Sequence, residues 1–257
     1  MSKSRKHAFP EPRLITATDD LADTVSRLRQ ETFVTVDTEF MREKTYWPEL
    51  CLIQIAGETE VVLIDSLAPG IDLDPLKALF DDINVVKVFH AARQDLEIFL
   101  HLFGALPKPL FDTQVAAMVA GYGDQVGYDN LVGALTGAAI DKSHRFTDWS
   151  VRPLSAAQLT YAAADVTYLR LVYQGLIDQL EREGRAGWVE AELAALSDPD
   201  RLVVDPEKQW VKLRARTRHR RMSCILKAIA ARPQPEPHHP HAPRPCTPTD
   251  HSLLYIL

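Results

Sequence analysis

Two acidic residues interrupt an otherwise apolar strand near the start of the chain, and this feature constrains the fold more than any other. Residues 33–40 form a short segment rich in β-branched and aromatic residues, which predicts a strand. Asp37 and Glu39 are two positions apart, so their side chains point to the same face of that strand. Two like charges side by side in an apolar element are costly unless a positive group neutralises them. A divalent cation does so directly, and ligands that are all oxygen suit Mg²⁺ or Mn²⁺.

Further acids strengthen this interpretation. A lone Asp-x-Glu is more often incidental, with one acid capping a turn and the other exposed at a strand end. Here Asp95 follows an apolar strand at residues 85–89, and Tyr161 and Asp165 lie four positions apart on one helix face. Taken alone, an acid such as Asp95 is more often a solvated residue on a helix. Taken alone, Tyr161 and Asp165 are more often a pair on the protein surface. Four acids on three elements, in this order, are much harder to explain as chance.

Strands come first along the chain and then alternate with helices. Predicted strands at residues 33–40, 50–56 and 61–65 follow one another closely, which indicates an antiparallel meander. A helix is predicted from Asp74 onward, before the strand at 85–89. After that strand, further helices are predicted at 91–103, within 111–119, at 131–135 and at 155–183. Ser155 opens the last of these and Gly184 closes it. The order predicts an α/β sheet with helices on its faces.

Composition sets broad limits. The 257 residues carry a net charge of -6, so the charge of the whole chain gives no hint of nucleic acid, and any such ligand needs a local basic surface or a metal ion. The three cysteines, Cys51, Cys224 and Cys246, show no metal-ligand spacing. No signal peptide and no run of about 18 apolar residues is visible. We therefore expect a cytoplasmic protein without membrane association.

The character of the chain changes near residue 198. Residues 208–227 contain eight Lys or Arg and no Asp or Glu, which indicates either a surface that tracks phosphates or a solvated helix face. Seven of the 17 prolines then lie between Pro233 and Pro248. This Pro- and His-rich segment is predicted to be disordered or extended.

The motifs in this order resemble the DEDDy exonucleases, whose signature is Asp-x-Glu, then an Asp after a strand, then Tyr-x-x-x-Asp. Within that group the chain resembles the ribonuclease D family over roughly residues 12–230. The supporting stretches are residues 36–40 (Val-Asp-Thr-Glu-Phe), 46–55 (Tyr-Trp-Pro-Glu-Leu-Cys-Leu-Ile-Gln-Ile), 89–97 (Phe-His-Ala-Ala-Arg-Gln-Asp-Leu-Glu), 111–114 (Phe-Asp-Thr-Gln), 127–128 (Gly-Tyr), 148–154 (Asp-Trp-Ser-Val-Arg-Pro-Leu) and 161–165 (Tyr-Ala-Ala-Ala-Asp).

The resemblance implies a ribonuclease H-like mixed sheet, two divalent metal ions (Mg²⁺ or Mn²⁺) and removal of nucleotides from RNA 3′ ends. Asp37 is expected to bridge both ions, Glu39 and Asp165 to complete the site of the ion that holds the attacking water, and Asp95 to hold the second ion, directly or through water. Tyr161 is expected to orient that water, since an unperturbed tyrosine has a pKa of about 10. The implied substrate is RNA with a free single-stranded 3′ end, transfer RNA precursors in particular.

Five residues are candidate substrate contacts, each with a structural alternative. Phe40 and Met41 adjoin the acids, and for Phe40 a place in the core is favoured. His90 ends a strand and is equally well a structural histidine. Tyr128 is equally well packed within its loop, and Arg152 more readily forms a structural salt bridge than a phosphate contact.

The resemblance also divides the chain into an extension at residues 1–11, an exonuclease domain at 12–197, a partial helical HRDC-like segment at 198–231 and a disordered tail at 232–257. The tail lacks the helical pattern expected after the HRDC opening. We hypothesise a frameshifted or truncated C-terminus, which an intact reading frame ending at Leu257 in independent isolates would contradict.

Two other functions compete with an exoribonuclease. A DNA-directed DEDDy exonuclease has the same acids, so only the flanking stretches favour RNA. A non-catalytic RNA-binding module on the same fold is disfavoured, because the five catalytic positions carry chemically competent residues.

Overall fold

The computed structural model describes residues 9–42, 47–196, 198 and 202, and the structural statements below concern those residues. The chain divides into two units, residues 1–41 with 50–199 and residues 42–49 with 200–257. The fold and the candidate site described here belong to the first unit. The expected HRDC-like segment at 198–231, its basic stretch and the tail at 232–257 lie outside the described residues, apart from Asp198 and Leu202.

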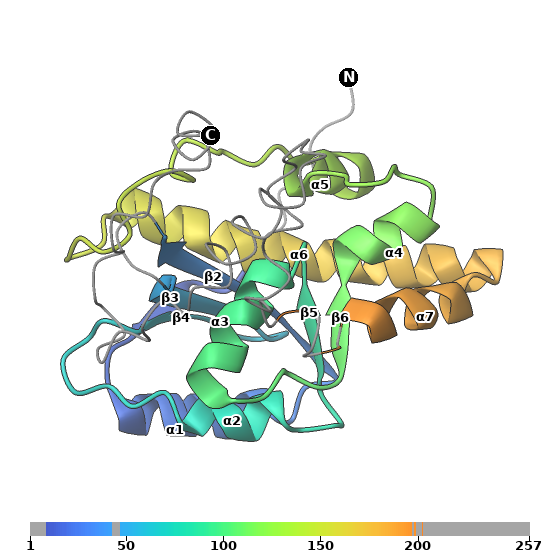
Figure 1. Cartoon of the computed structure of the whole chain (residues 1–257). Coiled ribbons are helices and arrows are strands. Elements are labelled where there is room, and N and C mark those ends of the chain that lie inside the picture. Colours follow the sequence, from blue (N-terminus) through green and yellow to red (C-terminus); the bar gives the residue numbers. More distant parts are fainter. Residues whose placement is uncertain (1–8, 43–46, 197, 199–201, 203–257) are drawn as a thin grey trace, which may run out of the picture. The chain divides into compact units, whose positions relative to one another are not determined.

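A six-stranded mixed sheet forms the centre of the first unit, in the order β1-β4-β3-β2-β5-β6 (Figure 1). Its strands are β1 (Pro12–Ile15), β2 (Phe33–Met41), β3 (Glu49–Ala56), β4 (Val61–Asp65), β5 (Val86–Phe89) and β6 (Leu110–Asp112). β3 and β4 are antiparallel, whereas β5 is parallel to both β2 and β6. The predicted α/β sheet, with consecutive strands β2, β3 and β4 side by side and parallel strands added, is confirmed.

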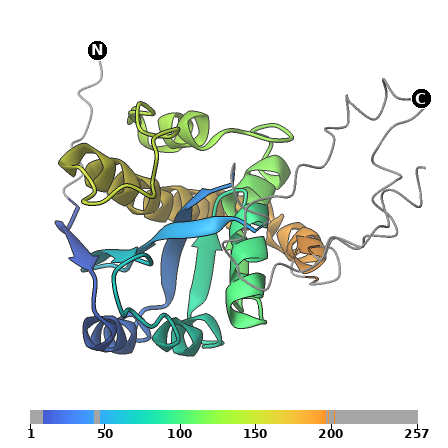
Figure 2. The same ribbon diagram turned by 60° about the vertical axis from the view of Figure 1, so that its left-hand side comes forward.

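Helices cover both sides of this sheet. They are α1 (Thr18–Leu28), α2 (Pro75–Phe80), α3 (Arg93–Phe103), α4 (Thr113–Val119), α5 (Tyr128–Thr136), α6 (Ala156–Glu183) and α7 (Ala186–Leu196). Figures 1 and 2 show α6 on one side of the sheet and the α1–α2 pair on the other. None of the described helices combines the length and the apolar character that crossing a membrane requires.

Several elements differ from the expectation. The sequence did not predict β1, α1 or α7. The helix expected within 111–119 begins only at Thr113, because Phe111 and Asp112 pair with β5 as strand β6. The Asp112 carboxylate then accepts hydrogen bonds from the backbone N–H groups of Gln114 and Val115, which opens α4. A three-residue apolar strand directly before a helix is too short to separate from that helix by periodicity alone.

The long helix α6 is the element that brings distant parts of the chain together. Its ends match the prediction, with a capping box at Ser155 and a left-handed Gly184 (φ 67°) after its last turn. The small side chains of Ala162 and Ala163 pack against the sheet at β3 and β4. The Thr35 hydroxyl on β2 donates to the Val166 carbonyl on α6 at 2.7 Å. α6 is therefore fixed above the strand that carries Asp37 and Glu39.

A fully buried lysine, Lys87, lies near the start of β5. Lys87 has no exposed surface, and its Nζ donates to the backbone carbonyls of Asp82 (2.7 Å) and Lys108. Burial lowers the pKa of Lys87 to about 8, although the charges of Asp82 and Asp81 oppose this shift. A lysine in this position gives its buried ammonium two backbone carbonyls as hydrogen-bond partners.

We expect Lys87→Met to lower the free energy of unfolding by about 1–3 kcal/mol, because both carbonyls lose their donor. Chemical denaturation followed by circular dichroism measures the change. Lys77→Met is the control, since Lys77 is a half-exposed lysine in an ion pair with Asp74. Equal stability of the two variants would show that the Lys87 hydrogen bonds contribute nothing net.

Candidate active site

Three carboxylates meet where β2 lies under α6. The alternation of β2 places Asp37 and Glu39 on one face, and α6 places Asp165 above them. One oxygen from each of the three lies within 4.8 Å of the others. Asp37 and Glu39 are half-buried, and Asp165 is buried with 8% of its surface exposed. The structure thus brings together three of the four acids that the sequence singled out.

Burial and mutual repulsion hold protons on these acids. Burial, together with the charges of Asp37 and Asp165, raises the pKa of Glu39 to about 10. Burial and then the charge of Asp165 raise the pKa of Asp37. Burial raises the pKa of Asp165 to about 7, against the lowering effects of the Tyr161 hydrogen bond and the Arg145 charge. Such a cluster favours the binding of a divalent cation. The cation neutralises the repulsion between the carboxylates and takes their oxygens as ligands.

Asp95 faces the same cavity from the first turn of α3. Its carboxylate is buried and accepts a hydrogen bond from the Thr38 hydroxyl at 2.5 Å. Burial raises the pKa of Asp95, and the charge of Asp37 adds to this. Asp95 does not belong to the group of three acids whose oxygens lie within 4.8 Å. The expected role of Asp95 at a second ion stays a prediction.

Asp112 shapes the turn that presents Asp95. Its carboxylate accepts from the N–H groups of Ala91 (3.1 Å) and Ala92 (2.8 Å) just before α3. Ala91 has a φ of 57°, which a residue other than glycine rarely adopts. Asp112 therefore anchors the start of α3 as well as that of α4. The Phe-Asp-Thr-Gln stretch signalled this segment, but the sequence alone did not assign Asp112 this role.

Tyr161 lies one helical turn before Asp165. Its ring packs between Trp149 (centroids 6.0 Å apart) and His144 (6.5 Å). Burial raises the pKa of Tyr161 well above its usual value, and the charges of Asp165 and Glu39 raise it further. The phenol therefore keeps its proton and acts as a hydrogen-bonding group that is held in a fixed orientation.

These residues line one cavity of about 500 Å³. Three of the five candidate substrate contacts, Phe40, His90 and Tyr128, lie on its wall with the four acids and Tyr161. Its other lining residues are Thr38, Ala91, Gln94, Gln114, Gly127, Asp129, Ile140, Lys142, Arg145, Phe146 and Leu169. The volume falls within the roughly 300–1,000 Å³ that is usual for ligand sites.

His90 and Tyr128 also hold the cavity wall together. Because the Thr113 hydroxyl donates to the Phe89 carbonyl, it accepts a hydrogen bond from Nδ1 of His90 (2.9 Å). Burial lowers the pKa of His90, which favours the neutral ring. The Tyr128 hydroxyl donates to the backbone carbonyl of Asp165 at 2.6 Å and so ties α5 to α6. Both residues combine a structural contact with a place on the wall.

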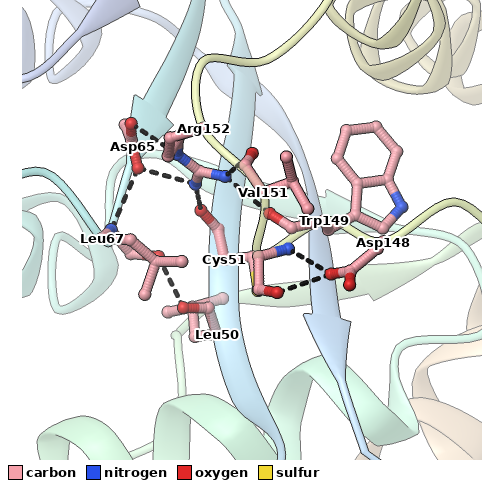
Figure 3. Close-up of polar contacts among 10 residues, drawn as sticks. Leu50, Cys51, Asp65, Leu67, Asp148, Trp149, Val151 and Arg152 are labelled. Atoms are coloured by element: carbon pink, nitrogen blue, oxygen red, sulfur yellow. Dashed lines mark hydrogen bonds and ion pairs between the residues drawn. The ribbon is translucent and has the colours of Figure 1, made fainter.

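The other two candidates are not on the cavity wall. Met41 packs against the apolar cluster between α6 and the sheet. Arg152 pairs with Asp65 through Nε (2.8 Å) and Nη2 (2.7 Å), as Figure 3 shows. It also donates to the carbonyls of Cys51 (2.7 Å) and Trp149 (2.6 Å). The structural alternative for Arg152 is therefore confirmed: it clamps the segment before α6 onto β3 and β4.

Lys142, Arg145 and Phe146 are among the lining residues that the sequence analysis did not single out. They lie between α5 and α6, in a segment without regular secondary structure. Lys142 pairs with Asp129 at the start of α5, at 2.6 Å. The signal in the sequence was a pair of basic residues beside an aromatic residue, shortly before the Asp-Trp-Ser stretch.

The raised pKa values predict that divalent-ion binding releases protons. At pH 7 Glu39 is protonated and Asp165 partly so, whereas a cation requires the ionised forms. Affinity should therefore fall as the pH drops below 7 and rise as the pH increases. Titration calorimetry with Mn²⁺ at pH 7, in buffers of different ionisation enthalpy, counts the protons. Asp178→Asn, which changes an exposed acid of α6, is the control; ion uptake without proton release would contradict the prediction.

Comparison with known proteins gives the family. A model of the 3′-5′ exonuclease family matches residues 12–181. The ribonuclease D of Gluconacetobacter diazotrophicus is 63% identical over 256 residues, and that of Granulibacter bethesdensis is 56% identical over 256 residues. Each match covers 100% of this chain, which spans 65% of the length of either relative.

Solved structures agree with this assignment. Escherichia coli RNase D, described as an exoribonuclease involved in structured RNA processing, matches with a TM-score of 0.78 at 37% identity, over 86% of this chain and 59% of that one. Brucella melitensis NrnC with bound Mg²⁺ matches with a TM-score of 0.60 at 31% identity, over 72% of this chain and 88% of that one. The chain therefore belongs to the 3′-5′ exonuclease family and is similar over its length to the ribonuclease D proteins of these bacteria.

Proposed function

We propose that this chain is a metal-dependent 3′-5′ exoribonuclease that releases 5′-mononucleotides from single-stranded RNA 3′ ends. The convergence of Asp37, Glu39 and Asp165 within 4.8 Å carries the proposal, because the three acids need a cation at the base of a cavity. The relatives named ribonuclease D favour RNA over DNA as the substrate. Transfer RNA precursors with 3′ extensions are the substrate that we expect in the cell.

The donor set fits two Mg²⁺ or Mn²⁺ ions. Asp37, Glu39 and Asp165 would hold one ion, and Asp37 with Asp95 the second. When bound, such ions supply an acidified water and stabilise the leaving oxygen of a phosphodiester. The raised pKa values of the acids support the fit, since only a cation makes their shared ionisation favourable at neutral pH.

The surrounding residues orient the reactants. The protonated phenol of Tyr161 donates to the Asp165 carboxylate and can hold a water in line with the phosphate. Phe40 and Tyr128 offer aromatic surface on which terminal bases can stack. Neutral His90 adds a polar edge without attracting the backbone phosphates. These groups contribute through position, since Tyr161 holds its proton at neutral pH.

The decisive experiment is the digestion of matched 5′-labelled RNA and DNA oligonucleotides, and of a 3′-extended transfer RNA, with Mg²⁺, with Mn²⁺ or with chelator. Stepwise shortening of RNA that depends on the ion supports the proposal. Faster digestion of DNA would favour the DNA-directed alternative. Tight RNA binding without shortening would identify a non-catalytic binding module.

Asp37→Ala should abolish cleavage and leave the fold intact. Because Asp37 repels Asp165, Glu39 and Asp95, its loss relieves repulsion, and the metal-free variant should melt at the same temperature as the parent or higher. Thermal unfolding in chelator and the oligonucleotide assay measure both effects. Asp178→Ala, the control on an exposed acid of α6, should retain activity. Near-normal turnover of Asp37→Ala would contradict the mechanism.

Tyr161→Phe should lower kcat by about 100-fold and change the Kd for RNA little, because a positioned hydroxyl acts in the transition state more than in the ground state. Single-turnover kinetics and binding titrations separate the two quantities. Tyr168→Phe, on the same helix but beside Phe9, is the matched control. Equal losses in kcat and in RNA binding would assign Tyr161 to substrate binding instead.

A further inference from the structure

The cavity is strongly acidic, and one of its cations is not matched to an acid. Its lining includes the acids Asp37, Glu39, Asp95, Asp129 and Asp165 and the cations Lys142 and Arg145. Lys142 is paired with Asp129 at 2.6 Å. Within the part of the chain that the structure describes, the Arg145 side chain has no ion pair and no side-chain hydrogen bond. Its charge nevertheless acts on Glu39 and Asp165, whose pKa values it lowers.

An exposed aromatic ring lies beside this cation. Phe146 is 91% exposed, the most exposed of the large apolar side chains described, and it also lines the cavity. The Arg145 guanidinium carbon lies 5.4 Å from the centre of the Phe146 ring. An exposed ring beside an unpaired guanidinium suits a ligand that is aromatic at one end and anionic at the other, as a nucleotide is.

The loop that carries the pair is held in place on both sides. The Lys142–Asp129 ion pair ties it to α5, and the backbone N–H of Arg145 donates to the Lys142 carbonyl at 3.2 Å. After Phe146, the Thr147 hydroxyl donates to the His144 carbonyl, and Trp149 is buried against the sheet. Arg145 and Phe146 therefore project from a fixed loop, which lowers the entropic cost of ordering them on a ligand.

We propose that Arg145 and Phe146 form the nucleotide subsite of this cavity: the guanidinium binds an oxygen of the scissile phosphate, and the Phe146 ring stacks on the 3′-terminal base. This inference rests on the proposed function and adds the residues that seat its substrate. Arginine suits the phosphate because its planar guanidinium presents several N–H donors to phosphate oxygen. The scissile phosphate is the one concerned, because Arg145 faces the acids that gather the metal ions.

The test uses the full chain and two independent readouts. In the first, hydrolysis with Mg²⁺ is measured for an RNA ending in a normal nucleotide and for the same RNA ending in an abasic one. We expect Arg145→Met to lower kcat/KM by about 100-fold on both RNAs, as removal of one stabilising donor does. Phe146→Ala should lower it by about 10-fold on the normal RNA only, since the abasic end has no base to stack.

The second readout does not depend on hydrolysis. Calorimetry with adenosine 5′-monophosphate and Mg²⁺ should show binding that both Arg145→Met and Phe146→Ala weaken by about 10-fold or more. Arg145→Lys should recover part of the loss, and Phe146→Trp should recover all of it. Arg182→Met, at an exposed arginine whose Nε donates to the Asp178 carbonyl, is the control and should match the parent.

The outcomes distinguish a failure of the proposed exoribonuclease function from a failure of the Arg145–Phe146 subsite. If the parent does not shorten RNA, the proposed function fails, and the nucleotide titration still decides whether the subsite exists. If the parent is active and Arg145→Met matches Arg182→Met in both readouts, the Arg145 assignment is overturned. An equal effect of Phe146→Ala on normal and abasic RNA would overturn the stacking assignment. Circular dichroism should show unchanged folding, because both side chains are on the surface.

Discussion

Repulsion between carboxylates that are buried together is the constraint on which the rest of this structure depends. Asp37, Glu39 and Asp165 approach within 4.8 Å, and each has a pKa above its ordinary value. Left to itself, such a cluster would drive α6 away from β2. The buried apolar face of α6 and the hydrogen bonds of Thr35 and Tyr128 to its backbone hold it in place. The fold thus keeps a site that a divalent cation can stabilise.

Polar side chains near the site fall into two groups. Arg152, Asp112 and Lys87 are committed to backbone groups or to a buried partner, and they fix loops and helix starts. Arg145 and Phe146 instead face the cavity from its rim. Residue type does not separate these groups, since Arg152 and Arg145 are only seven positions apart. The contacts of each side chain decide which one stabilises the scaffold and which one is available to a substrate.

The arrangement divides the work of the proposed reaction among separate elements. The sheet, α3 and α6 supply the acids and Tyr161, which demand fixed relative positions and come from rigid elements. The segment between α5 and α6 supplies the cation and the exposed ring, which must follow the shape of a nucleotide. A loop held at both ends suits this second task, because it can differ in sequence without disturbing the acids.

Much of the site could be predicted from the sequence. The period of a strand places Asp37 and Glu39 on one face, and the period of a helix places Tyr161 beside Asp165, so these pairings follow from local geometry alone. The fold class followed from the order of strands and helices. The short strands β1 and β6 could not be recognised, because so few residues carry no reliable periodicity.

What only the tertiary structure decided is which distant residues meet. The sequence offered Arg152 as a phosphate contact and did not single out Arg145, and only the packing of that stretch shows that Arg152 clasps Asp65 while Arg145 faces the acids. Likewise Asp112 anchors α3 because β6 lies next to β5, a neighbour that no local pattern reveals. Local periods are properties of the sequence, whereas contacts across about 20 to 100 positions depend on how the chain folds back on itself.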